Sequence, residues 1–88
     1  MKKTIKNKRI SLTRGWKKQQ PNNRQRVIMY SKCGKKCFLG QKLSYPICTK
    51  NTCKINRKGV QSAYIRSRQF HRKNISLKAH KLLDKMSD

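Results

Sequence analysis

The segment CGKKCFLGQKLSYPICTKNTC, residues 33–53, contains all four cysteines of an 88-residue chain. They form two close pairs, Cys33 with Cys37 and Cys48 with Cys53, separated by a ten-residue spacer. A chain of this length, with a mean hydropathy of −1.00, buries too little apolar surface to be stable by packing alone. We therefore expect the four cysteines to hold the fold together.

Two chemistries suit this spacing. Four thiolates in pairs a few residues apart can bind one structural Zn²⁺ tetrahedrally. The same cysteines can form two disulfides in one of three connectivities, and bridges between the pairs would pin the same segment. Four free buried thiols are a third alternative. The Met-Lys-Lys start is not followed by the apolar stretch of a secretion signal, so we expect a reducing compartment, which favours the metal.

The pattern predicts a small, cysteine-stapled α+β fold. Residues 27–30 are β-branched and aromatic enough for a short strand, and the spacer 38–47 has room for a β-hairpin. One or two helices are expected towards the C-terminus. The apolar residues of the spacer form the expected miniature core: Phe38, Leu39, Leu43, Tyr45 and Ile47.

Three zones follow along the chain. Residues 1–26 are expected to be an extended basic arm, residues 27–58 a four-cysteine hairpin module, and residues 59–88 an amphipathic basic helical segment. Trp16 is the large apolar residue of the arm, and it is either an anchor into a partner or a lid over the cysteine module. The helical stripe that we expect to pack inward is Ile75, Ala79, Leu82, Leu83 and Met86.

Charge is the second dominant feature. The chain has 25 Lys and Arg against two Asp, no Glu, and a formal net charge of +23. Such a chain is expected to bind acidic protein surfaces in a large assembly, or the phosphate backbone of DNA or RNA. The candidate contact residues are Lys2, Lys3, Lys6, Lys8, Arg9, Arg14, Lys17, Lys18, Arg24, Arg26, Arg57, Lys58, Arg66, Arg68, Arg72 and Lys73.

Several classes of function do not fit the sequence. The carboxylates are Asp84 and Asp88 alone, so paired-carboxylate catalysis is excluded, and we expect no acid near either histidine to orient a triad. No P-loop or dinucleotide-binding fingerprint occurs. The longest apolar run, residues 27–30, is far shorter than a membrane span. We expect no catalysis, no small-molecule substrate and no membrane span.

Two resemblances to known families add context. Lys36-Cys37-Phe38, followed by Cys48 and Cys53, is similar to the zinc module of the ubiquitin-fused large-subunit ribosomal protein, although the three-residue gap of the first pair and the flanking sequence depart from it. This resemblance implies a zinc ribbon that binds nucleic acid, in a ribosomal or DNA-condensing protein of the ribosome or nucleus.

The second resemblance spans residues 32 to about 70. Its motifs are KCGKKCFLG (32–40), YPIC (45–48), CKINRKG (53–59) and AYIR (63–66), which look like those of small basic proteins of nucleocytoplasmic large DNA viruses. It implies a minor capsid or core component of a virion assembled in the host cytoplasm, where a viral thiol-oxidising system operates. In that setting, two disulfides and a structural zinc are equally favoured interpretations of the four cysteines.

Overall fold

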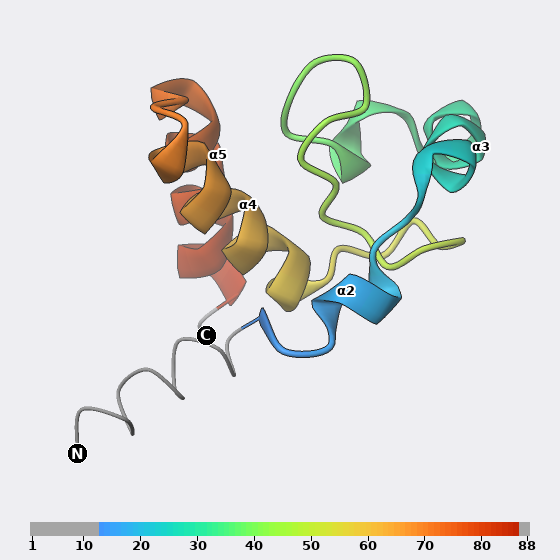
Figure 1. The fold of residues 1–88 in the computed structure, drawn as a ribbon, viewed down its shortest axis with the longest axis horizontal. Helices are drawn as coiled ribbons and strands as arrows, with labels where there is room; N and C mark the ends of the chain where they lie inside the picture. The colour runs from blue at the N-terminus through green and yellow to red at the C-terminus, as the bar shows by residue number, and fades with distance from the viewer. Residues whose placement is uncertain (1–12, 87–88) are drawn as a thin grey trace.

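The computed structural model describes residues 13–86, and within them it is helical (Figure 1). The elements in order are α2 (Trp16–Gln19), α3 (Asn23–Cys33), the 3₁₀ helix η1 (Gly34–Cys37), α4 (Arg57–Gln69) and α5 (Lys73–Met86). Helices α4 and α5 form an antiparallel hairpin on one side of the molecule. Helix α3 lies on the other side, and the chain from Phe38 to Asn56 runs between them without regular structure.

The expected α+β hairpin module is wrong. The described residues contain no strand, only two isolated antiparallel bridges, Phe38 with Pro46 and Cys48 with Ile55. The spacer forms a loop that returns on itself, and it is closed by the Leu39 N–H, which donates to the Tyr45 carbonyl at 3.1 Å. The Gly40 N–H donates to the Ser44 carbonyl at 3.2 Å, but no β-ladder forms, because Lys42, Leu43 and Tyr45 have positive φ and turn the chain away from extended geometry.

The strand expected at residues 27–30 is also wrong, because these residues lie inside α3. Asn22 and Gln25 form a capping box at its start: each side chain accepts a hydrogen bond from the other's backbone N–H, both at 2.8 Å. Two initial N–H groups are thereby satisfied, and this start signal outweighs the β-propensity of Val27 and Ile28. The helices expected after residue 59 are present as α4 and α5.

The expected extended arm is wrong for the described part of residues 1–26, since α2 and the first turns of α3 lie there. Residues 1–12 lie outside the described range. Trp16 is 5% exposed, and a Cβ added at Gly59 would come within 2.6 Å of its indole. The Trp16 side chain therefore packs on the first turn of α4 and is buried within the chain itself.

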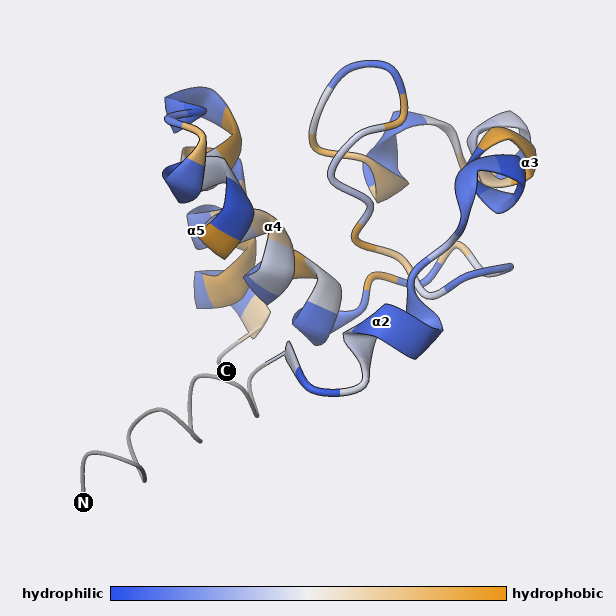
Figure 2. Cartoon of the chain, viewed as in Figure 1, coloured by the Kyte–Doolittle hydropathy of each residue, from blue (hydrophilic) through white to orange (hydrophobic). Residues whose placement is uncertain are grey.

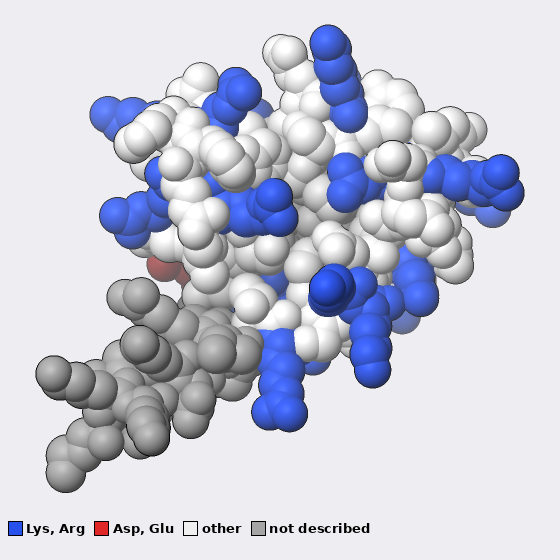
Figure 3. Space-filling model, viewed as in Figure 1, with Lys and Arg blue, Asp and Glu red and all other residues white. Residues whose placement is uncertain are grey.

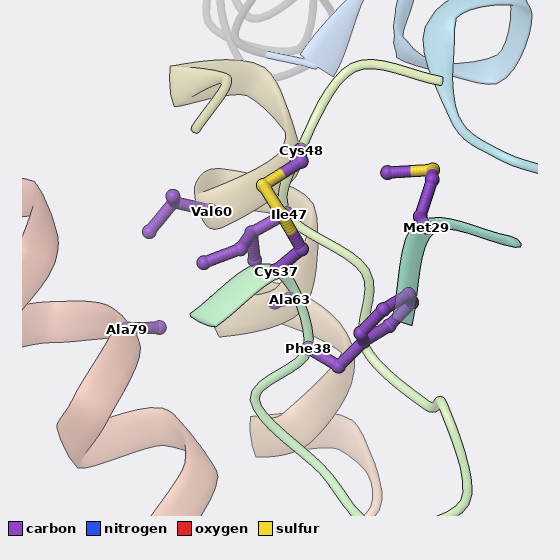
Figure 4. Close-up of a cluster of buried hydrophobic side chains, with 8 residues drawn as sticks. All are labelled: Met29, Cys37, Phe38, Ile47, Cys48, Val60, Ala63 and Ala79. Carbon is purple, nitrogen blue, oxygen red and sulfur yellow. A yellow bond between two sulfur atoms is a disulfide. The ribbon is translucent and has the colours of Figure 1, made fainter. Parts of the chain in front are cut away.

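The core lies where the loop segment meets α4 (Figure 4). Cys37, Ile47 and Cys48 are fully buried together with Val60 of α4 and Ala79 of α5. Of the expected miniature core, Phe38 and Ile47 are buried, while Leu39, Leu43 and Tyr45 are partly buried against the cluster. Figure 2 shows apolar residues along α5 and on α3 in a chain that is otherwise hydrophilic. The core is small, so the covalent links carry much of its stability.

Candidate polyanion-binding groove

The four cysteines form two disulfides that join the two ends of the loop segment. Cys37 pairs with Cys48, and Cys33 pairs with Cys53 outside it, with Cα–Cα distances of 5.1 and 5.4 Å. Both connect one expected cysteine pair to the other. The inner bridge is 0% exposed at both residues, whereas Cys53 of the outer bridge is exposed.

The structural zinc is not what the structure shows. All four thiols are consumed in disulfides, so none is available as a thiolate ligand. Residues 13–86 contain no other group of His, Cys, Asp and Glu side chains that could hold a metal ion. The link that we expected the cysteines to provide is therefore a pair of disulfides.

The loop and the α4–α5 turn enclose a groove of about 1470 Å³. We call it the basic groove. Its floor and walls come from the end of α3, the loop 38–45 and the start of α5. Three aromatic residues line it, Tyr30, Phe38 and Tyr45. Its cationic lining residues are Lys35, Lys36, Lys42, Arg72, Lys73 and Lys78.

The basic groove continues over the turn between α4 and α5. A second hollow, of about 450 Å³, shares His71, Arg72 and Lys73 with it and adds Arg68. All four of these side chains are exposed. The two hollows therefore present one cationic surface that runs from the loop to the end of α4.

Backbone strain is concentrated at this groove. Within residues 13–86 five non-glycine residues have positive φ, and four of them line the groove: Lys42, Leu43, Tyr45 and His71. Such residues cost about 1–3 kcal/mol each when bulky, and they persist where surrounding contacts hold them. Strain of this kind collects at binding sites, which marks the groove as the candidate functional site.

Arg26 holds the strained loop from the side of α3. Its Nη1 donates to the Leu43 carbonyl at 3.1 Å and its Nε to the Pro21 carbonyl at 3.3 Å. Burial lowers the pKa of Arg26 from its ordinary value, and the positive charge of Arg66 lowers it further. The two carbonyl acceptors offset part of that cost, because they stabilise the charged guanidinium. Arg26 is therefore a positioning residue for the loop, and its charge is only half exposed.

The cations of the described surface have no carboxylate partners. Within residues 13–86 the one close contact between a basic and an acidic side chain joins His80 to Asp84, at 3.6 Å on the exposed side of α5. The expectation that no acid lies near either histidine is therefore wrong for His80. Figure 3 shows Lys and Arg side chains scattered over much of the visible face and one small acidic patch. The positive charge is therefore available to a partner. No helix in this part of the chain is long and apolar enough to cross a bilayer.

The structure brings together only part of the predicted cationic set. Arg72 and Lys73 line the basic groove, and Arg68 extends it, with its Nη1 3.2 Å from the Tyr64 hydroxyl. Outside the groove lie Arg14, Lys17, Lys18, Arg24, Arg57, Lys58 and Arg66. Outside the described residues lie Lys2, Lys3, Lys6, Lys8 and Arg9.

Four groove cations were missing from the predicted set: Lys35, Lys36, Lys42 and Lys78. The first three lie inside the cysteine segment, residues 33–53. The signal that points to them is the local run of Lys without acid between Cys33 and Lys42. Their approach to α5 depends on the tertiary fold, and no spacing in the sequence indicates it.

Comparison with known proteins finds no match: no family model, no curated protein and no solved structure matches this chain. The function is therefore argued from the site itself.

Proposed function

We propose that this chain is a non-enzymatic structural protein of a large DNA virus particle, a minor capsid or core component. It acts as a basic cement, which neutralises acidic surfaces of neighbouring capsid proteins, or encapsidated DNA, and so holds them together. The observation that carries this proposal is the cationic surface centred on the basic groove, which has no carboxylate partners within residues 13–86. A chain with net charge +23 has a strong electrostatic need for an anionic partner.

The disulfides support the particle setting. Disulfides are rare in proteins that stay in a reducing cytosol. A virion component oxidised by a viral thiol-oxidising system, as the second sequence resemblance implies, would carry them. They also suit a structural part, because two covalent links keep a small core folded while its surface binds a much larger assembly.

The lack of catalytic groups at the groove supports a binding role. Its lining contains no carboxylate and no cysteine, and its one imidazole is that of His71. An acid–base pair or an activated nucleophile has no candidate there. The groove offers positive charge, aromatic rings and backbone, which are the elements of a binding surface.

A second candidate function is binding to nucleic acid as such, in a ribosomal or DNA-condensing protein. The observation that favours it is the juxtaposition of cations with aromatic rings, since bases can stack on Tyr30, which is 43% exposed. The zinc ribbon of this alternative is replaced by the disulfides. If about ten cations met duplex phosphates, log K against log salt would have a slope near −9.

Zero-length cross-linking in purified particles tests the proposal. A carbodiimide joins a Lys amine to a carboxylate only where the two are in contact. We expect the chain to be present in washed, nuclease-treated particles, with Lys42, Lys73 or Lys78 joined to Asp or Glu of capsid proteins. Absence of the chain from such particles contradicts the proposal. Its loss on nuclease treatment supports the nucleic-acid alternative instead.

A further inference from the structure

We infer that the basic groove binds an extended protein segment in which carboxylates alternate with apolar side chains. This inference rests on the proposed function, because it names the partner chemistry of the same surface. Three observations carry it: the size of the groove, its unpaired cations, and an apolar strip on α3 that leads into it.

The groove is too large and too open for a small ligand. Small-molecule pockets have volumes of about 300–1,000 Å³ and enclose most of the ligand, whereas this one has about 1470 Å³ and lies open between loop and helix. A chain segment fits such a shape. Lys42 on the loop and Lys78 on α5 both line it, so a segment lying in the groove is in reach of cations from two different elements.

The apolar strip distinguishes a protein from a nucleic acid. Helix α3 buries Met29 alone, and three of its apolar residues are exposed: Val27 by 60%, Ile28 by 47% and Tyr30 by 43%. Val27 and Tyr30 are three residues apart and lie next to each other on the helix surface. Because Tyr30 also lines the groove, the exposed apolar strip and the cationic groove are continuous. A partner that covers both needs apolar side chains beside its carboxylates.

The other occupants fit less well. A second copy of the chain is opposed by charge, since each copy carries a net +23. A nucleic-acid strand would find few stacking platforms, because Phe38 is only 6% exposed and Tyr45 is partly buried. It would also leave Val27 uncovered. A rigid, strained loop suits an extended peptide, since a preformed site loses little entropy when the segment binds.

Fluorescence anisotropy on the oxidised full-length chain at physiological ionic strength tests the inference. Three labelled probes of equal net charge are compared: a peptide with alternating Asp and Leu, a peptide with alternating Asp and Gly, and a single-stranded oligothymidylate. We expect the Asp–Leu peptide to bind about tenfold more tightly than the Asp–Gly peptide, since burial of a few leucines adds apolar contact.

Matched variants locate the binding. Replacing Lys42, Lys73 and Lys78 by Gln is expected to weaken binding of the Asp–Leu peptide about tenfold, because three ion pairs are lost. The control replaces three exposed cations outside the groove, Lys17, Lys50 and Lys54, by Gln, with the same loss of charge. It should weaken binding about threefold or less, through long-range charge alone.

A second pair of variants tests the apolar strip. Val27→Ser with Tyr30→Ser should abolish the preference for the Asp–Leu peptide over the Asp–Gly peptide. The control, Phe70→Ser with Leu77→Ser, removes two equally exposed apolar residues outside the groove and should preserve that preference. Circular dichroism of each variant confirms that its helices are retained.

The outcomes distinguish peptide binding, purely charge-driven binding and nucleic-acid binding at the groove. Equal losses in the two Lys→Gln triples, or equal affinity for the two peptides, overturn the inference and leave a charge-driven cement intact. Tighter binding of oligothymidylate that displaces the peptide also overturns it and assigns the groove to nucleic acid. If no anionic probe binds at physiological ionic strength, the proposed function itself fails.

Discussion

The two disulfides join the same two stretches of chain but lie in different surroundings. The Cys37–Cys48 bridge is fully buried and packs among Ile47, Val60 and Ala63 in the core. The Cys33–Cys53 bridge follows the end of α3, and its Cys53 is exposed. The inner bridge is therefore part of the core as well as a link, whereas the outer bridge lies at the edge of the core, with Cys33 partly buried against it and Cys53 exposed.

Loop length and burial rank the two bridges in opposite order. The outer bridge spans 20 residues and the inner 11, so loop entropy alone would make the outer one more stabilising by about 0.5 kcal/mol. Burial reverses this ranking, because removing the inner sulfurs also empties space in a packed interior. The stability of matched variants thus reports whether packing or chain entropy dominates in this molecule.

The largest effect is expected from removing the inner bridge. Cys37→Ala with Cys48→Ala should lower the free energy of unfolding by about 4 kcal/mol, through lost constraint and two buried sulfur-sized voids. A chain this small and this highly charged has little more stability than that. We expect the cooperative thermal transition in circular dichroism to disappear. A sharp transition within a few degrees of the parent would contradict the covalent core.

Trp16→Ala is expected to have the next largest effect. The indole is buried over Gly59, so its removal should lower the free energy of unfolding by about 3 kcal/mol and lower the melting temperature of the whole fold. Phe70→Ala is the control, since Phe70 is 58% exposed and should change stability by less than about 0.5 kcal/mol. Similar melting temperatures for the two variants would show that Trp16 is not a core residue.

Removing the outer bridge should cost less. Cys33→Ala with Cys53→Ala is expected to lower the unfolding free energy by about 2 kcal/mol, since the inner bridge already closes most of the loop. Denaturant titration with both double variants gives the comparison directly. If the outer pair proves more costly than the inner pair, then loop entropy outweighs burial here.

The smallest effect is expected at Arg26. Arg26→Lys keeps the charge but loses the second of its two carbonyl hydrogen bonds, and should destabilise the fold by about 1 kcal/mol or less. Its larger consequence is local: amide hydrogen exchange at residues 41–45 should become faster than in the parent. Arg24→Lys, on the exposed side of α3, is the matched control and should leave that exchange unchanged.

Some of the site was predictable from residues and some was not. The importance of the cysteines and the cationic character of the surface follow from composition and spacing. The choice of disulfides over zinc and the pairing 33–53 with 37–48 do not, because three connectivities and a tetrahedral metal site are all compatible with the same spacing. The helix at 23–33 was predictable from the capping pair Asn22 and Gln25, which the β-branched residues after it obscured.

The sequence by itself predicts that this chain needs a covalent or metal link to fold, and it fixes a large excess of positive charge, from which we propose an anionic partner. Both follow from quantities that do not depend on conformation: too little apolar surface, four clustered cysteines, and 25 cations against two carboxylates. Only the tertiary structure decides that Trp16 is interior and that Lys42 of the loop lines the same groove as the cations of α5. Residues distant in sequence lie close together there because two disulfides and a strained loop hold them in place. Local conformational propensities do not encode these contacts.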